Sequence, residues 1–193
     1  CYPSVEEVPE SPDAAMVLLP SEMILDIVED CLSTGIKNII VVSSGFSETG
    51  TETGAQREAE LAALAEEYDA AILGPNSQGI INFSKGVAAC FTPALDRDEL
   101  HTGPVSFVTQ SGAFGGALTT LMQEAGIGLD KWVSTGNESA LGALSLIDQL
   151  AHDNSTEIVA GYLEGFDDGR KLVEIKRTEE AIDLPIVTMK VGT

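Results

Sequence analysis

Small and polar residues recur where apolar segments of this 193-residue chain end. The loops that follow the apolar segments are SSGFSE (43–48), GPNSQG (74–79), TQSGAFGG (109–116), TGNES (135–139), LEG (163–165) and KVGT (190–193). Their side chains offer hydroxyl and amide groups, and their small size lets a backbone approach a ligand, although the same residues also form ordinary turns. Ligands of open α/β sheets bind beyond the carboxyl ends of the strands. The repetition therefore favours a ligand-binding sheet edge.

The segment TQSGAFGG is the strongest candidate for an anion site. A strand expected over 104–109 ends there, and a helix begins directly after Ser111 and Gly112. The start of a helix has free N–H groups and partial positive charge, which suit a phosphate. No lysine follows, so this is not a Walker A loop, and Ser111 is out of frame for a GxSxG nucleophile. A plain strand–helix turn remains the alternative.

Glu164 is the second candidate, because it follows an apolar strand expected over 157–163. We expect its carboxylate at the same sheet edge as Gly112. A carboxylate in that position orients and stabilises a charged histidine, or acts as a base. The alternative is an acid that stabilises the start of the helix expected over 168–181.

Strand-like and helix-like segments alternate along the chain, which predicts an α/β fold with mostly parallel sheets and helices on both faces. Helical periodicity covers 22–34, 55–68, 113–125, 140–151 and 168–181. Further strands are expected at 14–19, 38–43, 70–73, 80–83, 87–91, 131–135 and 185–190. The aperiodic segment TPALDRDELHTG (92–103) predicts a boundary between two domains, at 1–96 and 103–193.

Charge excludes several classes of partner. Lysine and arginine total 10 against 31 aspartate and glutamate residues, a net charge of −21. Such a surface repels nucleic acid and anionic membranes. Because the acids are spread along the chain, we expect a salt-adapted cytoplasmic protein, with an ordinary acidic protein as the alternative.

Cysteine and histidine usage predicts neither a disulfide framework nor a metal site. The three cysteines show no CxxC spacing, which fits a reducing cytosol. His101 and His152 have no second ligand at zinc-finger spacing and are expected at the surface. No apolar run reaches the length of a membrane span, and we expect no signal peptide at the start of the sequence.

Taken together, the motifs GPNSQG, TQSGAFGG, TGN (135–137), YLEG (162–165) and PIVTMKVGT resemble the nucleoside-diphosphate-forming acyl-CoA synthetases. These enzymes are relatives of the succinyl-CoA synthetase alpha subunit, and the ADP-forming acetyl-CoA synthetases are the nearest match. The resemblance implies a partial Rossmann-like CoA-binding domain followed by a flavodoxin-like ligase domain.

In that family an acyl-CoA reacts with phosphate to give an acyl phosphate and free CoA. The phosphoryl group then passes to a histidine, and from there to ADP bound with Mg²⁺ in a separate beta-type domain or subunit. The resemblance therefore implies coenzyme A and phosphate as ligands of this chain, ADP/ATP with Mg²⁺ outside it, and an oligomer.

The family's functional positions carry over where the motifs match. For coenzyme A these are Pro20, Val42, Ser43, Ser44 and Asn76. The family's phosphate-binding helix start matches Ser111 and Gly112, and its histidine-contacting glutamate matches Glu164.

The departures are equally informative. The family's phosphorylated histidine lies beyond the K-x-G-x segment at 190–193, and its Gly-rich opening loop has no counterpart here. Ser77 and Gly116 replace a cysteine and a tyrosine of the succinyl enzymes, which argues against succinate. We expect an internal part of a longer protein that is inactive by itself. Two alternatives remain open: a CoA- or acyl-CoA-sensing regulatory module, as in acetyltransferase-fused relatives without the histidine, and a flavodoxin-like scaffold that binds nothing at these loops.

Overall fold

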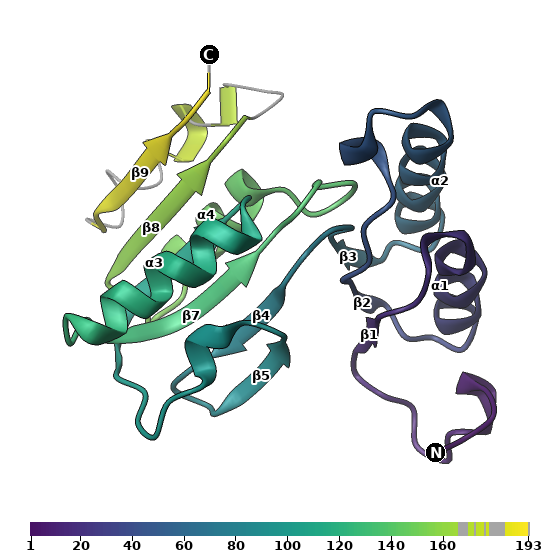
Figure 1. Ribbon diagram of the computed structural model, residues 1–193, viewed down its shortest axis with the longest axis horizontal. Coiled ribbons are helices and arrows are strands. Elements are labelled where there is room, and N and C mark those ends of the chain that lie inside the picture. Colours follow the sequence, from purple (N-terminus) through teal and green to yellow (C-terminus); the bar gives the residue numbers. More distant parts are fainter. Residues whose placement is uncertain (166–169, 172, 176, 178–183, 193) are drawn as a thin grey trace. The chain divides into compact units, whose positions relative to one another are not determined.

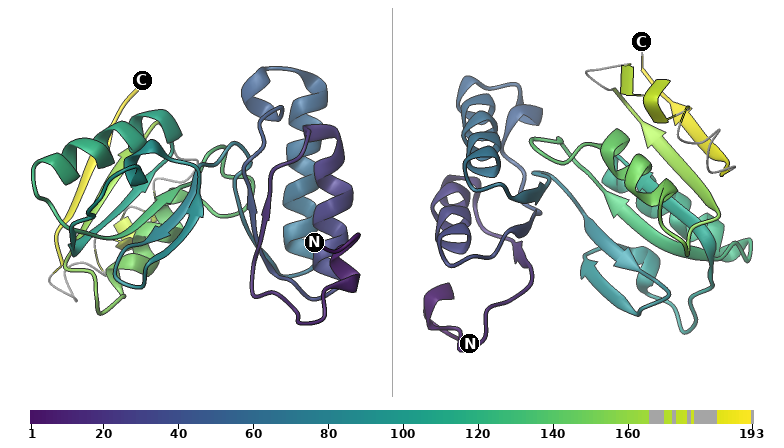
Figure 2. Two further views of the ribbon diagram at one scale, coloured as in Figure 1. Left: turned by 60° about the horizontal axis from the view of Figure 1, so that its bottom comes forward. Right: turned by 180° about the vertical axis from the view of Figure 1, so that it is seen from behind.

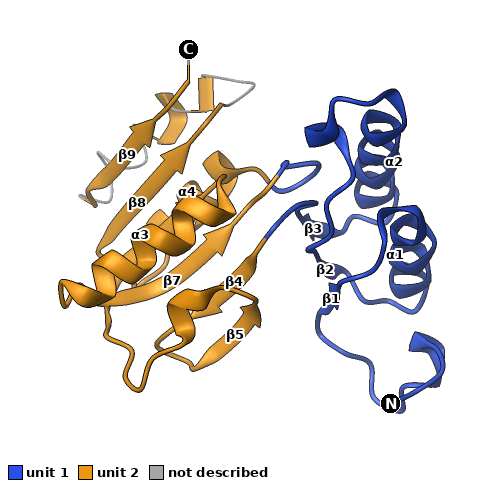
Figure 3. Cartoon of the chain, in the orientation of Figure 1, with its two compact units in different colours: residues 1–77, 137–141 blue, residues 78–136, 142–193 orange. Residues whose placement is uncertain are grey.

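The computed structural model describes residues 1–165, 170–171, 173–175, 177 and 184–192. The chain divides into two compact units, which Figure 3 distinguishes by colour: residues 1–77 with 137–141, and residues 78–136 with 142–193. The segment 137–141 leaves the second unit along the chain, joins the first and returns. Among the described helices, none has the length and apolar character needed to cross a membrane.

The first unit contains a parallel three-stranded sheet in the order β1-β2-β3, with two α-helices (Figure 1). The strands are β1 (Ala15–Val17), β2 (Asn38–Val41) and β3 (Ala71–Leu73), and the helices are α1 (Ile24–Ser33) and α2 (Glu52–Glu67). Short 3-10 turns are η1 (Val5–Glu7), η2 (Ser21–Met23) and η3 (Ser47–Thr49).

Both helices of the first unit pack on the same face of its sheet, which Figure 2 also shows. Val28 of α1 and Leu61 of α2 are fully buried in one core with Ile39 and Ile72 of the sheet. The expectation of helices on both faces is wrong for this sheet. Its strands are added in one direction, and successive right-handed crossovers in one direction place their helices on the same side.

The second unit contains a six-stranded sheet in the order β5-β4-β7-β6-β8-β9. Its strands are β4 (Gly79–Asn82), β5 (Val87–Cys90), β6 (Thr102–Thr109), β7 (Leu129–Ser134), β8 (Ile158–Leu163) and β9 (Ile186–Lys190). Its helices are η4 (Pro93–Leu95), α3 (Gly112–Glu124) and α4 (Ala143–Ala151). The described residues between 170 and 177 are helical, while the rest of the helix expected at 168–181 lies outside the described residues.

The strands β4 and β5 form an antiparallel hairpin that belongs to the second sheet. β4 pairs antiparallel with β7, where Ile81 lies opposite Trp132. The first domain expected from the sequence, 1–96, includes both strands, with a boundary at 92–103. In the structure the division falls between Ser77 and Gln78 instead. Periodicity predicts a strand but not its partner, because pairing is decided by contacts distant in sequence.

The second sheet is covered on both faces. Successive residues of β6 point to opposite sides: Phe107 packs in a core with Trp132 and Leu118 of α3, and Val108 packs in another with Ile147 of α4. β6 pairs in parallel with β7 on one side and with β8 on the other. The chain therefore reverses its direction across the sheet at β6. Such a reversal is the point at which open α/β sheets bind ligands, beyond the carboxyl ends of the strands.

Candidate functional site

The two sequence candidates of the second unit lie on neighbouring strand exits. Thr109, the last residue of β6, is in register with Tyr162 of β8, and the Gln110 N–H donates to the Tyr162 carbonyl at 3.1 Å. Ser111 and Glu164 therefore follow adjacent parallel strands at the reversal point. The expectation that Glu164 and Gly112 share a sheet edge is confirmed.

The start of α3 retains unused backbone donors. Ser111 is the N-cap, and its hydroxyl accepts a 3.4 Å hydrogen bond from the Phe114 N–H. The N–H groups of Gly112 and Ala113 have no acceptor among the described residues. The first turn carries no acidic residue, although the chain has 31 of them. Two free donors and the positive end of the helix dipole suit a phosphate oxygen.

The glycine at the first helical position leaves room for a neighbouring side chain. A Cβ atom at Gly112 would lie 2.7 Å from Cγ and 2.9 Å from Cδ of Gln78. Any larger residue there would displace Gln78 from the start of α3. The Oε1 atom of Gln78 is buried and accepts no hydrogen bond within the described structure. The close approach of Gln78 makes the surroundings of this helix start sensitive to added volume at Gly112.

Glu164 has an exposed side chain, while its backbone is held by Gln110. The Gln110 Oε1 atom accepts hydrogen bonds from the N–H groups of Glu164 at 2.5 Å and Gly165 at 3.0 Å. The Gln110 Nε2 group donates to the Gly165 carbonyl at 2.8 Å. Sequence reasoning did not single out Gln110, although it lies inside the TQSG segment.

In the first unit, the residues matched to coenzyme A gather at the carboxyl edge of the sheet. The Val42 N–H donates to the Val17 carbonyl at 3.1 Å, and the Asn76 N–H donates to the Ser43 carbonyl at 2.9 Å. Pro20 follows β1 in the same way, at the start of η2. The structure thus brings loops from three strands to one edge, as their positions after β1, β2 and β3 require.

Ser43 and Ser44 differ in which of their polar groups are available to a ligand. The Ser43 hydroxyl donates to the Leu19 carbonyl at 2.5 Å and accepts from the Leu19 N–H at 3.2 Å. That hydroxyl is therefore committed to the fold. Ser44 is exposed, and the backbone N–H groups of both serines have no acceptor among the described residues. The contribution of Ser43 to a ligand would come from its backbone.

Asn76 is connected to a polar network that the sequence did not reveal. Its Nδ2 group donates to Asn137 Oδ1 at 3.2 Å. Asn137 Nδ2 in turn lies 2.6 Å from Glu48 Oε2 and 2.7 Å from Glu58 Oε2. Partial burial acts to raise the pKa of Glu48, but hydrogen bonds from the Gly45 N–H and from Asn137 outweigh it and hold that pKa below its usual value. Asn137 was noted only as part of the TGN motif.

Neither histidine lies at the candidate edge. His101 precedes β6 and His152 precedes β8, so both are at the amino ends of the strands whose carboxyl ends lead to Ser111 and Glu164. Both are exposed, as expected, and His152 Nδ1 lies 2.8 Å from the Asp148 carbonyl oxygen.

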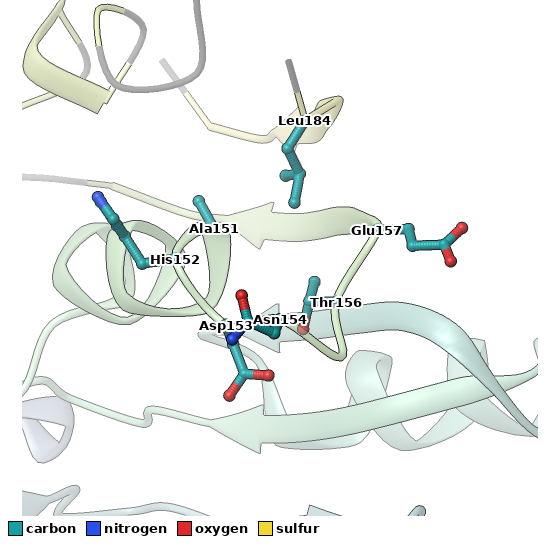
Figure 4. A pocket seen from close by; sticks show the side chains of 7 residues that line it. All are labelled: Ala151, His152, Asp153, Asn154, Thr156, Glu157 and Leu184. Carbon is teal, nitrogen blue, oxygen red and sulfur yellow. The ribbon is translucent and has the colours of Figure 1, made fainter. Parts of the chain in front are cut away.

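A pocket of about 440 Å³ also lies at that amino edge, and it lacks convergent chemistry. In Figure 4 the side chains of His152, Asp153 and Glu157 point in different directions. The Asp153 carboxylate already accepts a hydrogen bond from the Ser155 hydroxyl and forms an ion pair with Lys131. We therefore assign no site there.

The described residues offer no cluster of metal ligands, and neither Cys31 nor Cys90 has a thiol with a lowered pKa. Within the residues that the structure describes, no three histidine, cysteine, aspartate or glutamate side chains are placed to hold a metal ion. Burial raises the pKa of the Cys31 and Cys90 thiols, so both remain protonated and unreactive near neutral pH.

Comparison with known proteins matches each of the two parts of the chain to a family model. Residues 1–82 match the model of a CoA binding domain, and residues 102–193 match that of the succinyl-CoA ligase like flavodoxin domain. The chain carries the CoA-binding and succinyl-CoA ligase-like domains of the NDP-forming acyl-CoA synthetases. Along the chain, the CoA-binding domain precedes the ligase-like domain.

Curated relatives agree with this assignment. The chain is 37% identical over 192 residues to acetate–CoA ligase [ADP-forming] I of Archaeoglobus fulgidus, covering 100% of this chain and 27% of the relative. It is 32% identical over 191 residues to the alpha subunit of acetate–CoA ligase [ADP-forming] II of Pyrococcus furiosus, covering 99% and 40%. The chain thus spans well under half the length of these synthetases.

A solved structure has the same fold. An acetyl-coenzyme A synthetase of Candidatus Korarchaeum cryptofilum, in complex with phosphate and ADP, superposes with a TM-score of 0.89 at 33% identity, covering 100% of this chain and 40% of that one. The similarity extends over both units of this chain.

Proposed function

We propose that this chain is the CoA-binding and phosphate-binding part of an ADP-forming acyl-CoA synthetase. The overall reaction converts an acyl-CoA, ADP and phosphate into a carboxylic acid, CoA and ATP. The observation that supports the proposal most is the register of β6 and β8, which places the free N–H groups of Gly112 and Ala113 and the carboxylate-bearing Glu164 on adjacent strand exits. Such a pairing suits a phosphoryl group that passes to a histidine.

In this proposal the phosphate binds at the start of α3. The N–H groups of Gly112 and Ala113 donate to its oxygens, and Ser111 holds the helix start through its cap. Fixed backbone donors stabilise negative charge that develops on an attacking or transferred phosphoryl group, without having to reorient.

Coenzyme A binds along the carboxyl edge of the first sheet. The free N–H groups of Ser43 and Ser44 are available to its phosphates, and the exposed Pro20 and Asn76 are available for further contacts. When bound, coenzyme A supplies the thiol that leaves or attacks the acyl carbon.

Glu164 acts on a histidine that lies outside residues 1–193. Support comes from the positions of His101 and His152, which precede β6 and β8 and lie at the opposite edge of the sheet. The carboxylate of Glu164 orients the imidazole ring and stabilises its positive charge while it carries the phosphoryl group. ADP with Mg²⁺ binds a separate beta-type domain or subunit, and the assembly is an oligomer.

The test uses the full-length protein that contains this segment. It is incubated with radiolabelled ATP and Mg²⁺ in high salt, and protein-bound label is examined for stability to acid and base. We expect acid-labile, base-stable label that forms far more slowly in Glu164→Ala. Absence of any such label, with CoA still bound, would overturn the synthetase proposal in favour of a CoA-sensing module.

A second measurement tests whether phosphate and CoA bind at the carboxyl edges of the two sheets. Inorganic phosphate and CoA are titrated separately while backbone amide resonances are followed by NMR. Phosphate is expected to shift Gly112 and Ala113, and CoA to shift Ser43 and Ser44. If neither ligand perturbs any strand-exit residue, these loops belong to a scaffold that binds nothing.

A further inference from the structure

The side chain of Gln110 pairs with a backbone segment as another strand would. Its Oε1 atom accepts from the N–H groups of Glu164 at 2.5 Å and Gly165 at 3.0 Å, and its Nε2 group donates to the Gly165 carbonyl at 2.8 Å. The two bonds with Gly165 close a ring through its N–H and its carbonyl group, as a residue of a neighbouring strand would. One side chain of the β6–α3 loop thereby holds the residues directly after β8.

The Glu164 carboxylate depends on this backbone support. Its side chain is exposed and forms no hydrogen bond within the described residues. Only the backbone of Glu164 is therefore held in place, as it leaves β8 and meets Gln110. An ordered backbone reduces the conformational entropy that a catalytic carboxylate must lose on each encounter with its partner.

We propose that Gln110 is a positioning residue that fixes the Glu164–Gly165 backbone, so that the Glu164 side chain extends from a fixed point when it meets the phosphorylated histidine. This inference rests on the proposed function of Glu164. It also connects the two halves of the site, because Gln110 immediately precedes the Ser111 cap of the phosphate-binding helix start. The same residue thus sets the separation between bound phosphate and Glu164.

The first test is independent of activity. In the full-length protein, Gln110→Met removes the amide at nearly constant volume, and hydrogen–deuterium exchange of the Glu164 and Gly165 amides is measured. We expect exchange to accelerate by about tenfold or more at these two amides. Gln149→Met, at an exposed position of α4, is the control and should change neither. Unchanged exchange in Gln110→Met would overturn the inference.

The second test is a double-mutant cycle on histidine phosphorylation. If Gln110 acts through Glu164, Gln110→Met lowers the rate by about tenfold, and the double variant with Glu164→Ala is no slower than Glu164→Ala by itself. Additive losses would overturn the positioning role. If Glu164→Ala has no effect, the proposed function fails, whatever the exchange experiment shows.

A third variant guards against misfolding. Gln110→Glu retains an acceptor for the two N–H groups but places an oxygen against the Gly165 carbonyl. We expect it to retain more amide protection and a higher rate than Gln110→Met. If Gln110→Glu loses the amide protection of Glu164 and Gly165 but keeps the wild-type rate, these hydrogen bonds do not support catalysis, and the inference is contradicted.

Discussion

The side-chain amide of Asn137 donates a 2.6 Å hydrogen bond to Glu48, although the two residues are 89 positions apart in the sequence. Glu58 Oε2 lies 2.7 Å from the same nitrogen. One amide group thus separates two carboxylates, which would otherwise repel each other. Through its Oδ1 atom, Asn137 also holds Asn76, which we propose contacts coenzyme A.

Replacing Asn137 with aspartate is expected to destabilise the first unit. The change removes the donor and adds a third negative charge, so we expect a loss of about 1–3 kcal/mol in its free energy of unfolding. Hydrogen exchange of α2 amides measures this unit selectively. Asn154→Asp, an exposed position of the second unit, introduces the same charge as a control. Equal effects of the two substitutions would show that only net charge matters.

Arg57 is expected to support coenzyme A binding by joining two loops. Its Nη1 group lies 3.2 Å from Ser21 Oγ, next to Pro20, and 3.4 Å from the Gly45 carbonyl oxygen, next to Ser44. Arg57→Met frees both loops, so we expect CoA affinity measured by calorimetry to fall about tenfold, or ~1.4 kcal/mol.

Two further variants sharpen this prediction. Arg57→Lys should recover only part of the affinity, because one ammonium group does not reproduce the fork of a guanidinium. Arg97→Met removes an arginine of the second unit that pairs with Glu124, and should leave CoA affinity unchanged. Full affinity in Arg57→Met would contradict the role of this side chain.

Acid sensitivity is expected at Asp153. Hydrogen bonds from the Ser155 hydroxyl and N–H, aided by Lys131, lower the pKa of Asp153 from 3.8 to about 2. A carboxyl group whose pKa is lower in the folded state stabilises the fold above its unfolded pKa, and this contribution disappears as pH falls from about 4 towards 2. Asp153→Asn should therefore flatten the loss of stability over this range, measured by urea unfolding with Trp132 fluorescence. Asp98→Asn, at an exposed position, is the control, and an unchanged pH profile in Asp153→Asn would refute the assignment.

Salt is expected to stabilise this chain strongly. Its net charge of −21 is repulsive in dilute buffer, and the Debye length falls from about 10 Å at 0.1 M to about 3 Å at 1 M ionic strength. We expect the urea midpoint to rise steeply between 0.1 and about 2 M KCl. Sucrose at matched osmolality does not screen charge and should have a smaller effect. Equal effects of both would favour an ordinary acidic protein over a salt-adapted one.

Local sequence predicted the elements and the loops between them well. The strand that ends at Thr109 and the position of Glu164 directly after β8 lie where periodicity placed them, and α3 begins at Gly112, one residue before the helix expected over 113–125. Such features depend on alternation, capping and turn residues within a few positions of each other. The shared edge of Ser111 and Glu164 followed from the rule that parallel strands direct their carboxyl ends to one side.

Other features were decided only by the tertiary structure. The hairpin of β4 and β5 joined the second sheet, and α1 and α2 packed on the same face, because strand order is set by contacts between distant segments. For the same reason, nothing local marks Gln110 as a partner of Glu164, 54 positions away, or Asn137 as the donor between Glu48 and Glu58. The types and order of residues determined where ligands could bind, while long-range pairing determined which side chains hold those sites in place.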